Sequence, residues 1–545
     1  MEIAAFKIKG MTCDHCAQSV EKQFAGNEGI IESKVSYPSG SGEFRYDPDQ
    51  ITQEEIIDTI NATGHYTVDG EIESMDSSDN KFDLIIIGGG SGAFAAAIKA
   101  ESLGLTTLMV NGGLDFGGTC VNVGCVPSKN LIRAAETVYH ASHSNFTGIK
   151  PKGADIDFPQ VIKDKKKLVA TLQEKKYIDV VSDFENLTML KGWATFKDNK
   201  TIEVDGKAYK GLKFLIATGA TTSAPAIEGL KDVPYLTNVS LFDLKEQPKS
   251  LIVLGGGYIA LEIAQAYHRL GTKVTLLQRS QHVLSKLTPD ISDELLRHLR
   301  SEGINITTGL TFNSVTQENG SVTVHAEKLG ETKLFEAEKL VVATGTKPHT
   351  SQLGLENIGL ELTKSGHIAV NEKMETNLSN IYAAGDVANT PAFVYTAAFE
   401  GKIAVENAFS GAESKADYSS LPWVVFTDPQ VAGAGLDEAQ AESKGIPSET
   451  ATISLTDVPR AIAAYDTRGF IKLIRNPETD ELLGIRVVAP EGGELVMQVS
   501  LAIKYGIKAE ELANSLFPYL TLSEGVKLAA ITFHKDVKEL SCCAV

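Results

Sequence analysis

Positive charge is in short supply in this sequence. Its 545 residues include 51 lysines and arginines against 70 aspartates and glutamates, which gives a formal net charge of −19. Nucleic acids and anionic membranes attract basic surfaces, so we expect neither as a partner. The sequence also lacks an N-terminal basic segment followed by an apolar core, so no secretory signal is predicted.

Long apolar runs are missing as well. The most apolar long stretch, residues 251–267, contains three consecutive glycines and Glu262. We therefore predict a buried strand and helix there rather than a membrane span. Together these absences favour a cytoplasmic protein that does not insert into a membrane.

Cysteine is scarce, and none of the six cysteines is isolated. They form three close pairs: Cys13 with Cys16, Cys120 with Cys125, and Cys542 with Cys543. In a long chain without an export signal, this usage fits redox or metal chemistry better than a disulfide framework. Two neighbouring thiolates exchange with a disulfide or bind a soft metal ion. The distribution suggests a thiophilic ion that is caught at one end, handed over by the tail and reduced in the middle.

Residues 1–73 have the pattern of a small ferredoxin-like domain. We predict strands at 2–8 and 66–68, two strands within 31–46, and helices at 16–24 and 52–60, in the order βαββαβ. Residues 74–81 are polar and acidic, which is typical of a linker.

The main body contains an internal repeat. The apolar strand and glycine turn at residues 84–90 recur at 251–257, and each copy continues as G-x-G-x-x-A into a predicted helix. The first glycine permits a tight turn, the second lets a pyrophosphate approach, and the small third residue lets helix pack on strand. The repeat predicts an α/β fold with two Rossmann-like dinucleotide-binding domains. The motif residues are Gly88, Gly90 and Ala93 in the first copy and Gly255, Gly257 and Ala260 in the second.

The residue that ends the second strand of each copy normally reads the ribose of the nucleotide. It is Asn111 in the first copy and Gln278 in the second, and neither is the usual carboxylate. A carboxylate would repel a 2′-phosphate, whereas the neighbouring Arg279 can pair with one. We therefore favour NADPH over NADH at the second copy. At Asn111 we expect a ribose hydroxyl bonded by a neutral amide.

The central cysteines, Cys120 and Cys125, follow the first nucleotide motif. Their C-x4-C spacing is predicted to place both sulfurs at the start of a new helix, where Pro127 suits the first turn. A helix N-terminus lowers a thiol pKa, so one sulfur can be a thiolate at neutral pH. No second ligand pair lies near in the sequence, which argues against zinc. A structural disulfide is the remaining alternative.

Residues 117–129 resemble the redox-active disulfide segment of the pyridine nucleotide–disulfide oxidoreductases. The resemblance covers residues 82–545 and includes two Ala-Thr-Gly turns, at 217–219 and 343–345, and the segment 382–386. It implies that Cys125 faces the flavin of FAD as the charge-transfer thiolate and that Cys120 is the exchanging thiol. Lys129 would lie near the flavin N5 and pair with Glu262.

The same resemblance implies further roles in binding the cofactors. Tyr258 would cover the nicotinamide pocket until the cofactor displaces it, and Asp386 would meet the ribityl chain of FAD. Additional cofactor contacts are expected at Gly118, Thr119, Thr218, Gly219 and Gly345. The implied domains are FAD-binding at 82–222 and 347–416, NADPH-binding at 223–346, and an α+β dimerisation domain with the Cys-Cys tail at 417–545.

The C-terminal region indicates which kind of substrate the protein uses. Disulfide reductases of this family carry a His-Pro…Glu element whose histidine protonates the leaving thiol. Here Glu524 remains, but Tyr519 stands where the histidine is expected. A phenol with a pKa near ~10 is a poor proton shuttle at neutral pH, so an organic disulfide is disfavoured. The adjacent Cys542 and Cys543 can carry an ion. Incidental cysteines on a tail, or prenylation, are the alternatives.

With residues 426–430, 458–461 and 517–519, this end closely resembles the mercuric reductases of that family, and the similarity spans the whole chain. The resemblance implies a homodimer in which Cys542 and Cys543 of one subunit deliver Hg(II) to the inner pair of the other. Tyr177 and Tyr519 would assist the transfer. The alternative for both tyrosines is an ordinary half-buried aromatic residue.

Residues 10–16 resemble the G-M-T-C-x-x-C loop of heavy-metal-associated domains. The two soft sulfurs of Cys13 and Cys16 suit Cu(I), Zn(II) or Hg(II). A thioredoxin-type redox pair is the main alternative, and the ferredoxin-like order disfavours it. We expect His15, between the two cysteines, to face solvent.

These observations predict a flavoprotein that uses FAD and NADPH to reduce Hg(II) to Hg(0) in mercury resistance. The expected donors of the ion are Hg(II)–thiol complexes or a mercury-transferring protein. One alternative is a dihydrolipoamide dehydrogenase-like disulfide reductase fused to a metal-binding module. Another is a metal-binding or transfer protein whose flavin site is vestigial.

Overall fold

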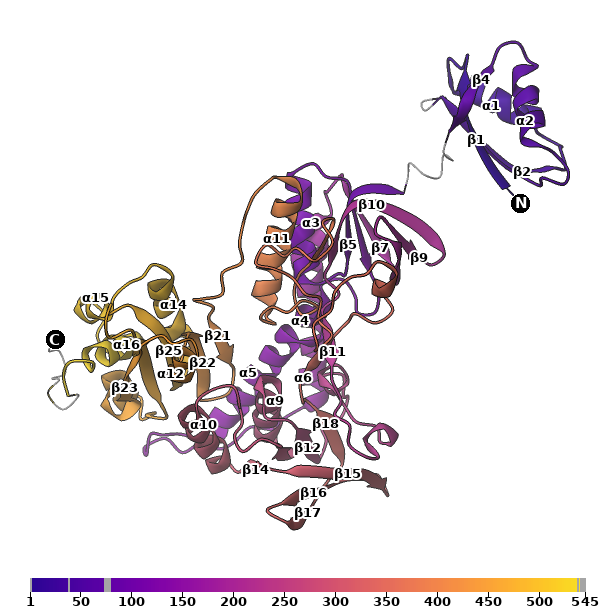
Figure 1. The fold of residues 1–545 in the computed structure, drawn as a ribbon. Coiled ribbons are helices and arrows are strands. Elements are labelled where there is room, and N and C mark those ends of the chain that lie inside the picture. Colours follow the sequence, from indigo (N-terminus) through magenta and orange to yellow (C-terminus); the bar gives the residue numbers. More distant parts are fainter. Residues whose placement is uncertain (1, 38–39, 73–79, 537–538, 540–545) are drawn as a thin grey trace.

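The computed structural model describes residues 2–37, 40–72, 80–536 and 539 (Figure 1). The first unit is a four-stranded antiparallel sheet, in the order β2-β3-β1-β4, with two helices. Thr52 and Glu55 cap its second helix by reciprocal hydrogen bonds. Phe6, Phe44 and Ile56 are fully buried between helices and sheet. The ferredoxin-like prediction is confirmed. The elements are β1 (Glu2–Lys9), α1 (Asp14–Gln23), β2 (Ile30–Ser36), β3 (Ser41–Tyr46), α2 (Gln53–Asn61) and β4 (Thr67–Ile72).

The first Rossmann-like domain is built on a seven-stranded sheet. Its core strands β7, β6, β5, β10 and β20 are parallel, and β9 and β8 are antiparallel additions. Helix α11, which comes late in the sequence, lies beside α3 (Figure 1). The two helices approach closely because Gly401 has no side chain: a Cβ there would come 2.1 Å from the carbonyl oxygen of Gly92. The strands are β5 (Lys81–Ile87), β6 (Thr107–Asn111), β7 (Leu187–Lys191), β8 (Ala194–Asp198), β9 (Thr201–Val204), β10 (Lys207–Ile216) and β20 (Ile381–Ala383). The helices are α3 (Ser91–Ser102), α4 (Gly118–Val123), α5 (Cys125–Ser142), α6 (Phe158–Gln173), the π-helical turn η2 (Glu174–Ile178), α7 (Asp179–Val181), η4 (Leu355–Asn357) and α11 (Val394–Phe409).

The second Rossmann-like domain repeats the design with a four-stranded parallel sheet in the order β14-β13-β12-β18. A three-stranded antiparallel sheet, β15-β16-β17, is inserted between β14 and β18, and the short pair β11-β19 joins the two domains. The strands are β11 (Ala220–Thr222), β12 (Ser250–Leu254), β13 (Lys273–Leu277), β14 (Asn305–Thr307), β15 (Thr311–Glu318), β16 (Ser321–Lys328), β17 (Glu331–Ala337), β18 (Lys339–Val342) and β19 (Thr346–Pro348). The helices are η3 (Leu230–Asp232), α8 (Asn238–Leu241), α9 (Tyr258–Arg269) and α10 (Pro289–Ser301).

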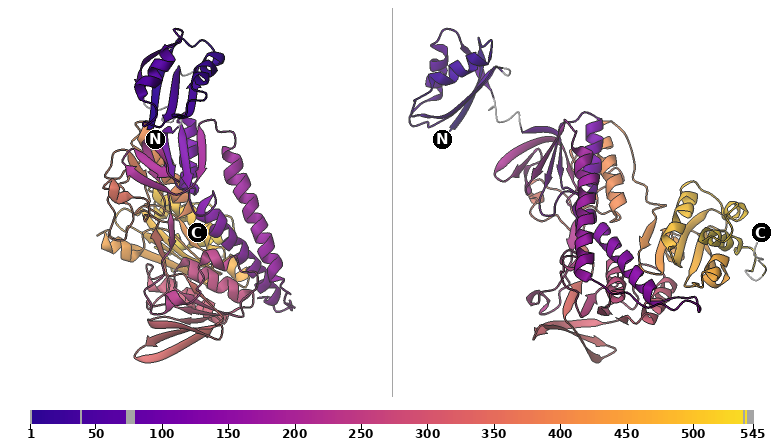
Figure 2. Two further views of the ribbon diagram at one scale, coloured as in Figure 1. Left: turned by 90° about the vertical axis from the view of Figure 1, so that its right-hand side faces the viewer. Right: turned by 180° about the vertical axis from the view of Figure 1, so that it is seen from behind.

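The C-terminal domain is a five-stranded antiparallel sheet, in the order β21-β22-β25-β24-β23, with helices packed on it. It lies beside the second Rossmann-like domain (Figure 2), and Lys472 of β24 pairs with Asp290 of α10 at 2.7 Å. The strands are β21 (Trp423–Val425), β22 (Gln430–Gly435), β23 (Glu449–Ser454), β24 (Phe470–Arg475) and β25 (Leu482–Ala489). The helices are α12 (Glu438–Ser443), η5 (Leu455–Asp457), α13 (Pro459–Ala463), η6 (Gly492–Leu495), α14 (Val496–Lys504), α15 (Ala509–Asn514) and α16 (Leu522–Ile531).

Within the described residues, no helix is both long enough and apolar enough to cross a bilayer. Cys542 and Cys543 lie outside the described residues.

Candidate active site

The central cysteines stand on two successive helices. We predicted both sulfurs at the start of one helix, and this is wrong for Cys120, which lies inside the short helix α4. Cys125 is the first residue of α5. The helical conformation is interrupted between them at Gly124. A Cβ on Gly124 would come 2.8 Å from the carbonyl oxygen of Thr119 and 3.3 Å from the Cα of Cys120. The lack of a side chain at Gly124 lets the two helices meet closely enough to bring the thiols together.

The two thiols differ in acidity. A hydrogen bond from Cys120 lowers the pKa of Cys125 to about 7, although burial opposes the shift, and the charge of Lys129 lowers it further. The same hydrogen bond, together with burial, raises the pKa of Cys120. Both thiols are free and partly buried. Cys125 therefore supplies a thiolate near neutral pH, while Cys120 keeps its proton.

An ion pair lies one helical turn beyond Cys125. The ammonium of Lys129 on α5 is 2.8 Å from a carboxylate oxygen of Glu262 on α9. The other oxygen of Glu262 accepts a hydrogen bond of 3.0 Å from the backbone N–H of Phe426, which follows β21. Three domains thus meet at this buried carboxylate. Residues 426–430 contributed to the resemblance, but the sequence assigned no role to Phe426, since its contact with Glu262 forms only in the folded chain.

Both nucleotide motifs form the predicted strand, turn and helix. A Cβ on Gly88 would come 2.2 Å from the carbonyl oxygen of Ala217, and one on Gly255 would come 2.3 Å from that of Ala343, so the repeat extends to the two Ala-Thr-Gly turns. Ala93 and Ala260 are fully buried where helix meets strand. The second motif glycines, Gly90 and Gly257, are the N-cap residues of α3 and α9, respectively.

The glycine turns of both copies fit a dinucleotide. A Cβ on Gly118 would come 2.6 Å from the Cα of Gly90, so α4 begins directly against the motif. A Cβ on Gly219, Gly257 or Gly345 would have no atom within 4 Å. Backbone, open space and helix N-termini are what a pyrophosphate needs. Nearby, Thr218 donates a hydrogen bond of 2.7 Å to the carbonyl of His349, and Thr119 lies between Gly118 and Cys120 on α4.

The two amides expected to read ribose lie against the motifs. A Cβ on Gly89 would come 2.5 Å from the side chain of Asn111, and one on Gly256 would come 3.0 Å from that of Gln278. The Asn111 amide donates a hydrogen bond of 2.8 Å to the carbonyl of Leu114. Arg279 is exposed and has no ion pair within the described part of the chain. Its guanidinium is available to an anionic ligand.

A buried glutamate holds the backbone next to Asp386, in the loop that follows β20. Burial raises the pKa of Asp386. The fully buried Glu400 of α11 accepts hydrogen bonds of 2.7 Å from the N–H of Gly385 and from the hydroxyl of Tyr418. Glu400 was missed by sequence reasoning. The sequence did not single it out, because the same helix also carries Lys402 and Glu406.

Aromatic side chains surround the start of α9. Tyr258 stacks on Trp423 of β21 with ring centroids 5.8 Å apart and an interplanar angle of 25°. Phe393 lies 6.5 Å from Tyr258 and stacks on Tyr395. Burial raises the pKa of Tyr258. Trp423 and Phe393 were not predicted, because they come from segments that are distant in sequence.

The two tyrosines expected to assist lie in different domains. The hydroxyl of Tyr177, on η2, is 3.0 Å from the hydroxyl of Ser91 at the start of α3. Burial raises the pKa of Tyr177. Its ring lies against the start of α4, the helix that carries Cys120, because a Cβ on the N-cap residue Gly117 would come 3.4 Å from it. Tyr519 is partly exposed in the loop before α16 of the C-terminal domain. Glu524 accepts a hydrogen bond of 3.1 Å from the N–H of Leu520 in the same loop.

The two N-terminal cysteines, Cys13 and Cys16, already lie close together. Cys13 is the N-cap residue of α1, and its sulfur is 3.5 Å from that of Cys16. Hydrogen bonds from Thr12, and one from Cys13, lower the pKa of Cys16 to about 6. His15 is exposed, as expected. Across the described side chains, no group of three or more His, Cys, Asp or Glu residues could hold a metal, so the described part of this loop offers the two sulfurs alone.

Sequence profiles of known families match the N-terminal domain, the two Rossmann-like domains and the C-terminal domain. The sequence profile of the family described as "Pyridine nucleotide-disulphide oxidoreductase" matches residues 82–401. The profile of its dimerisation domain matches residues 421–530, and that of the heavy-metal-associated domain matches residues 5–66.

Individual relatives agree with these profiles. The mercuric reductase of Lysinibacillus sphaericus is 42% identical over 544 residues, with 98% of each chain covered. That of Staphylococcus aureus is 41% identical over 542 residues, again with 98% of each chain covered. Among solved structures, the Cu(II) complex of the HOCl-induced flavoprotein disulfide reductase RclA from Escherichia coli has a TM-score of 0.75 and 27% identity, covering 84% of this chain and 100% of that one. The chain therefore belongs to the pyridine nucleotide-disulphide oxidoreductase family and, within it, to the mercuric reductases.

Proposed function

We propose that this protein is a cytoplasmic, homodimeric enzyme that uses FAD and NADPH to reduce Hg(II) to Hg(0), and so detoxifies mercury. The observation that carries the proposal is the thiol pair Cys120 and Cys125. One member is acidic and the other keeps its proton, and the pair lies beside the Lys129–Glu262 ion pair. Full-length similarity to mercuric reductases supports the choice of ion.

The thiol pair suits Hg(II) because the ion is soft and is held by two sulfurs. Cys120, the exchanging thiol, displaces one thiolate from an incoming Hg(II)–dithiolate complex, and its proton leaves with the departing thiol. The Cys125 thiolate then displaces the other thiolate, so that the ion is held by both cysteines. Tyr177, near the pair, can donate a hydrogen bond to a sulfur during this exchange. The ion passes from sulfur to sulfur and is never released into water.

The two nucleotide motifs would hold the cofactors. For FAD we propose the first motif, with Asn111 at a ribose and Asp386 at the ribityl chain. For NADPH we propose the second motif, with Arg279 at the 2′-phosphate and Tyr258 at the nicotinamide. Bound FAD supplies a two-electron relay between the nicotinamide and the metal ion. The Lys129 ammonium offers a fixed positive charge where reduction adds negative charge.

The subunit partnership rests on the dimerisation domain, which the family profile identifies at residues 421–530. Several large apolar side chains of this domain are exposed in the single chain, which is expected of a surface that a second copy covers: Ile462, Tyr465, Met497, Leu501, Tyr505 and Leu516. We propose that Cys542, Cys543 and Tyr519 act at the thiol pair of the partner. Hg(II)–thiol complexes, or a mercury-transferring protein, would supply the ion to the tail or to Cys13 and Cys16.

One assay separates this function from its alternatives. NADPH oxidation by the purified protein is followed in excess small thiol, with Hg(II), lipoamide or glutathione disulfide added in turn. We expect turnover with Hg(II) that is lost in Cys120→Ala and in Cys125→Ala. Comparable turnover with lipoamide would instead favour a disulfide reductase. Absence of turnover with all three would leave a metal-binding protein.

A further inference from the structure

The segment that follows β21 lies along one face of α9. The N–H of Phe426 donates to Glu262 at 3.0 Å, and the N–H of Asp428 donates to the side-chain oxygen of Gln265 at 2.7 Å. The Gln265 amide returns a hydrogen bond of 2.7 Å to the carbonyl of Asp428. Glu262, Gln265 and Arg269 are spaced three and four residues apart, so they share one helix face. The dimerisation domain thus contacts this face turn by turn.

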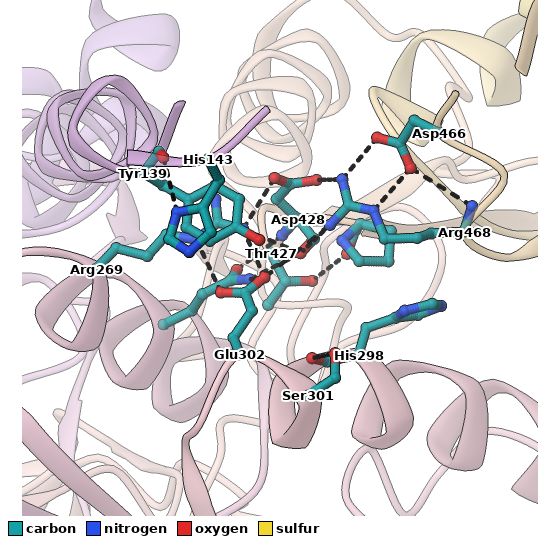
Figure 3. A network of polar contacts seen from close by, with 12 residues as sticks. Tyr139, His143, Arg269, His298, Ser301, Glu302, Thr427, Asp428, Asp466 and Arg468 are labelled. Carbon is teal, nitrogen blue, oxygen red and sulfur yellow. Dashed lines mark hydrogen bonds and ion pairs between the residues drawn. The ribbon is translucent and has the colours of Figure 1, made fainter. Parts of the chain in front are cut away.

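The far end of this contact is anchored by buried charges (Figure 3). Asp428 places one carboxylate oxygen 2.9 Å from Arg269 of α9 and the other 2.8 Å from Arg468 of its own domain. Arg269 also pairs with Glu302 at 2.6 Å, and these two side chains are only 2% and 5% exposed. Tyr139 of α5 covers the guanidinium of Arg269 at 4.0 Å. Opening such an anchor would leave unpaired buried charges, which is costly.

The near end of the contact reaches the Lys129–Glu262 ion pair. The ring of Phe426 has its centroid 4.4 Å from the ammonium of Lys129. Lys129 therefore lies between a carboxylate and an aromatic face, and one residue supplies both the ring and the N–H that holds that carboxylate. The Lys129 side chain is still 33% exposed, so without these contacts its four-carbon stem could turn toward solvent.

We propose that Phe426 is a positioning residue of the redox centre: it fixes the Lys129 ammonium by covering it with its ring and by holding Glu262 with its backbone N–H. The buried anchor at Asp428 keeps Phe426 in register on α9. The inference rests on the proposed function in one respect, which is that Lys129 lies beside a bound flavin. A cation held in place favours electron transfer to its neighbour more than a mobile one, because no reorganisation is needed as charge develops.

The test compares substitutions at two adjacent residues in the FAD-loaded, full-length protein. Phe426→Leu removes the aromatic face and keeps the backbone N–H, Phe426→Met repeats the test with an unbranched side chain of similar volume, and Phe426→Tyr restores the face. Val425→Ala is the matched control, because Val425 is fully buried in the neighbouring core and is not one of the residues that hold Lys129. Flavin reduction by NADPH is measured by stopped flow without mercury, and the midpoint potential of the flavin is measured separately.

We expect Phe426→Leu and Phe426→Met to slow flavin reduction about 3- to 10-fold, the size of one lost cation–π contact. The flavin potential should become more negative, while FAD content and NADPH affinity stay unchanged. Phe426→Tyr and Val425→Ala should stay near the parent protein in both rate and potential. An unchanged rate and potential in Phe426→Leu, or an equal loss in Val425→Ala, would overturn the proposal. Because no mercury is present, failure of mercury reduction would not affect this outcome.

Discussion

Cys125 owes its acidity to named neighbours. The hydrogen bond from Cys120 contributes most, and Lys129 adds an electrostatic contribution, while burial and Glu262 oppose them. A pKa of about 7 leaves about half of the thiol ionised at neutral pH. Cys125 can therefore take part in a sulfur exchange as a thiolate without a separate base.

Replacing Lys129 by Met should raise the pKa of Cys125, because a positive charge that favours the thiolate is removed. If the pKa rises by about one unit, the ionised fraction at pH 7 falls roughly fivefold. The measurement is the pH dependence of iodoacetamide alkylation of the reduced protein. Lys191→Met is the control, since Lys191 forms only an exposed pair with Asp115. An unshifted alkylation profile in Lys129→Met would contradict the assigned role of this charge.

Adding a single Cβ at Gly118 tests whether the first dinucleotide site is placed correctly. It has a positive φ of 64°, and a Cβ would come 2.6 Å from the Cα of Gly90. We expect Gly118→Ala to be purified with little or no flavin, as read from the visible absorbance per protein. Gly104→Ala is the matched control: its φ is 68°, but its Cβ would have no atom within 4 Å. Full flavin content in Gly118→Ala, or equal loss in both variants, would refute this fit.

At the scale of elements, α9 connects the parts of the site. Its first residue stacks on Trp423, its middle carries Glu262, and its last residue is Arg269 in the buried ion network. This helix therefore joins the second Rossmann-like domain to both of its neighbours.

Removing Arg269 should destabilise the protein strongly. Arg269→Met would leave Glu302 without its main partner and Asp428 with Arg468 alone, and breaking a buried pair costs about 3–5 kcal/mol. Urea denaturation gives the loss in free energy of unfolding. Arg297→Met removes a pair between the exposed Arg297 and the partly buried Glu294, which keeps His298 as a partner, so the loss should be no more than about 1 kcal/mol. Similar losses in the two variants would show that the network does not hold the domains together.

Some of the helices, strands and contacts could be predicted from the sequence, and others could not. The order of elements in the N-terminal domain and the two nucleotide motifs followed from local patterns, because turn glycines and apolar strands are short-range signals. The break between α4 and α5 was missed, since both cysteines fit one helix start equally well. Phe426, Glu400 and Trp423 were missed because their partners, Glu262, Gly385 and Tyr258, meet them only through tertiary packing.

At the scale of the whole molecule, the proposed function requires a second copy. Leu516 of the dimerisation domain is 98% exposed in the single chain. Leu516→Glu should weaken the dimer, because a charge would be buried when two copies associate. Sedimentation at decreasing protein concentration measures the effect. Leu329→Glu is the control, because Leu329 is 93% exposed in the turn between β16 and β17. An equally stable dimer in Leu516→Glu would remove Leu516 from the interface.

The central claim is that the inner thiol pair accepts Hg(II) and lets electrons from NADPH reach it. The most direct measurement is elemental mercury vapour released from purified protein that is given limiting NADPH and a Hg(II)–thiol complex. We expect one Hg(0) to be released for each NADPH oxidised, and none from Cys120→Ala or Cys125→Ala. Oxidation of NADPH without release of mercury vapour, or undiminished release from either variant, would contradict it.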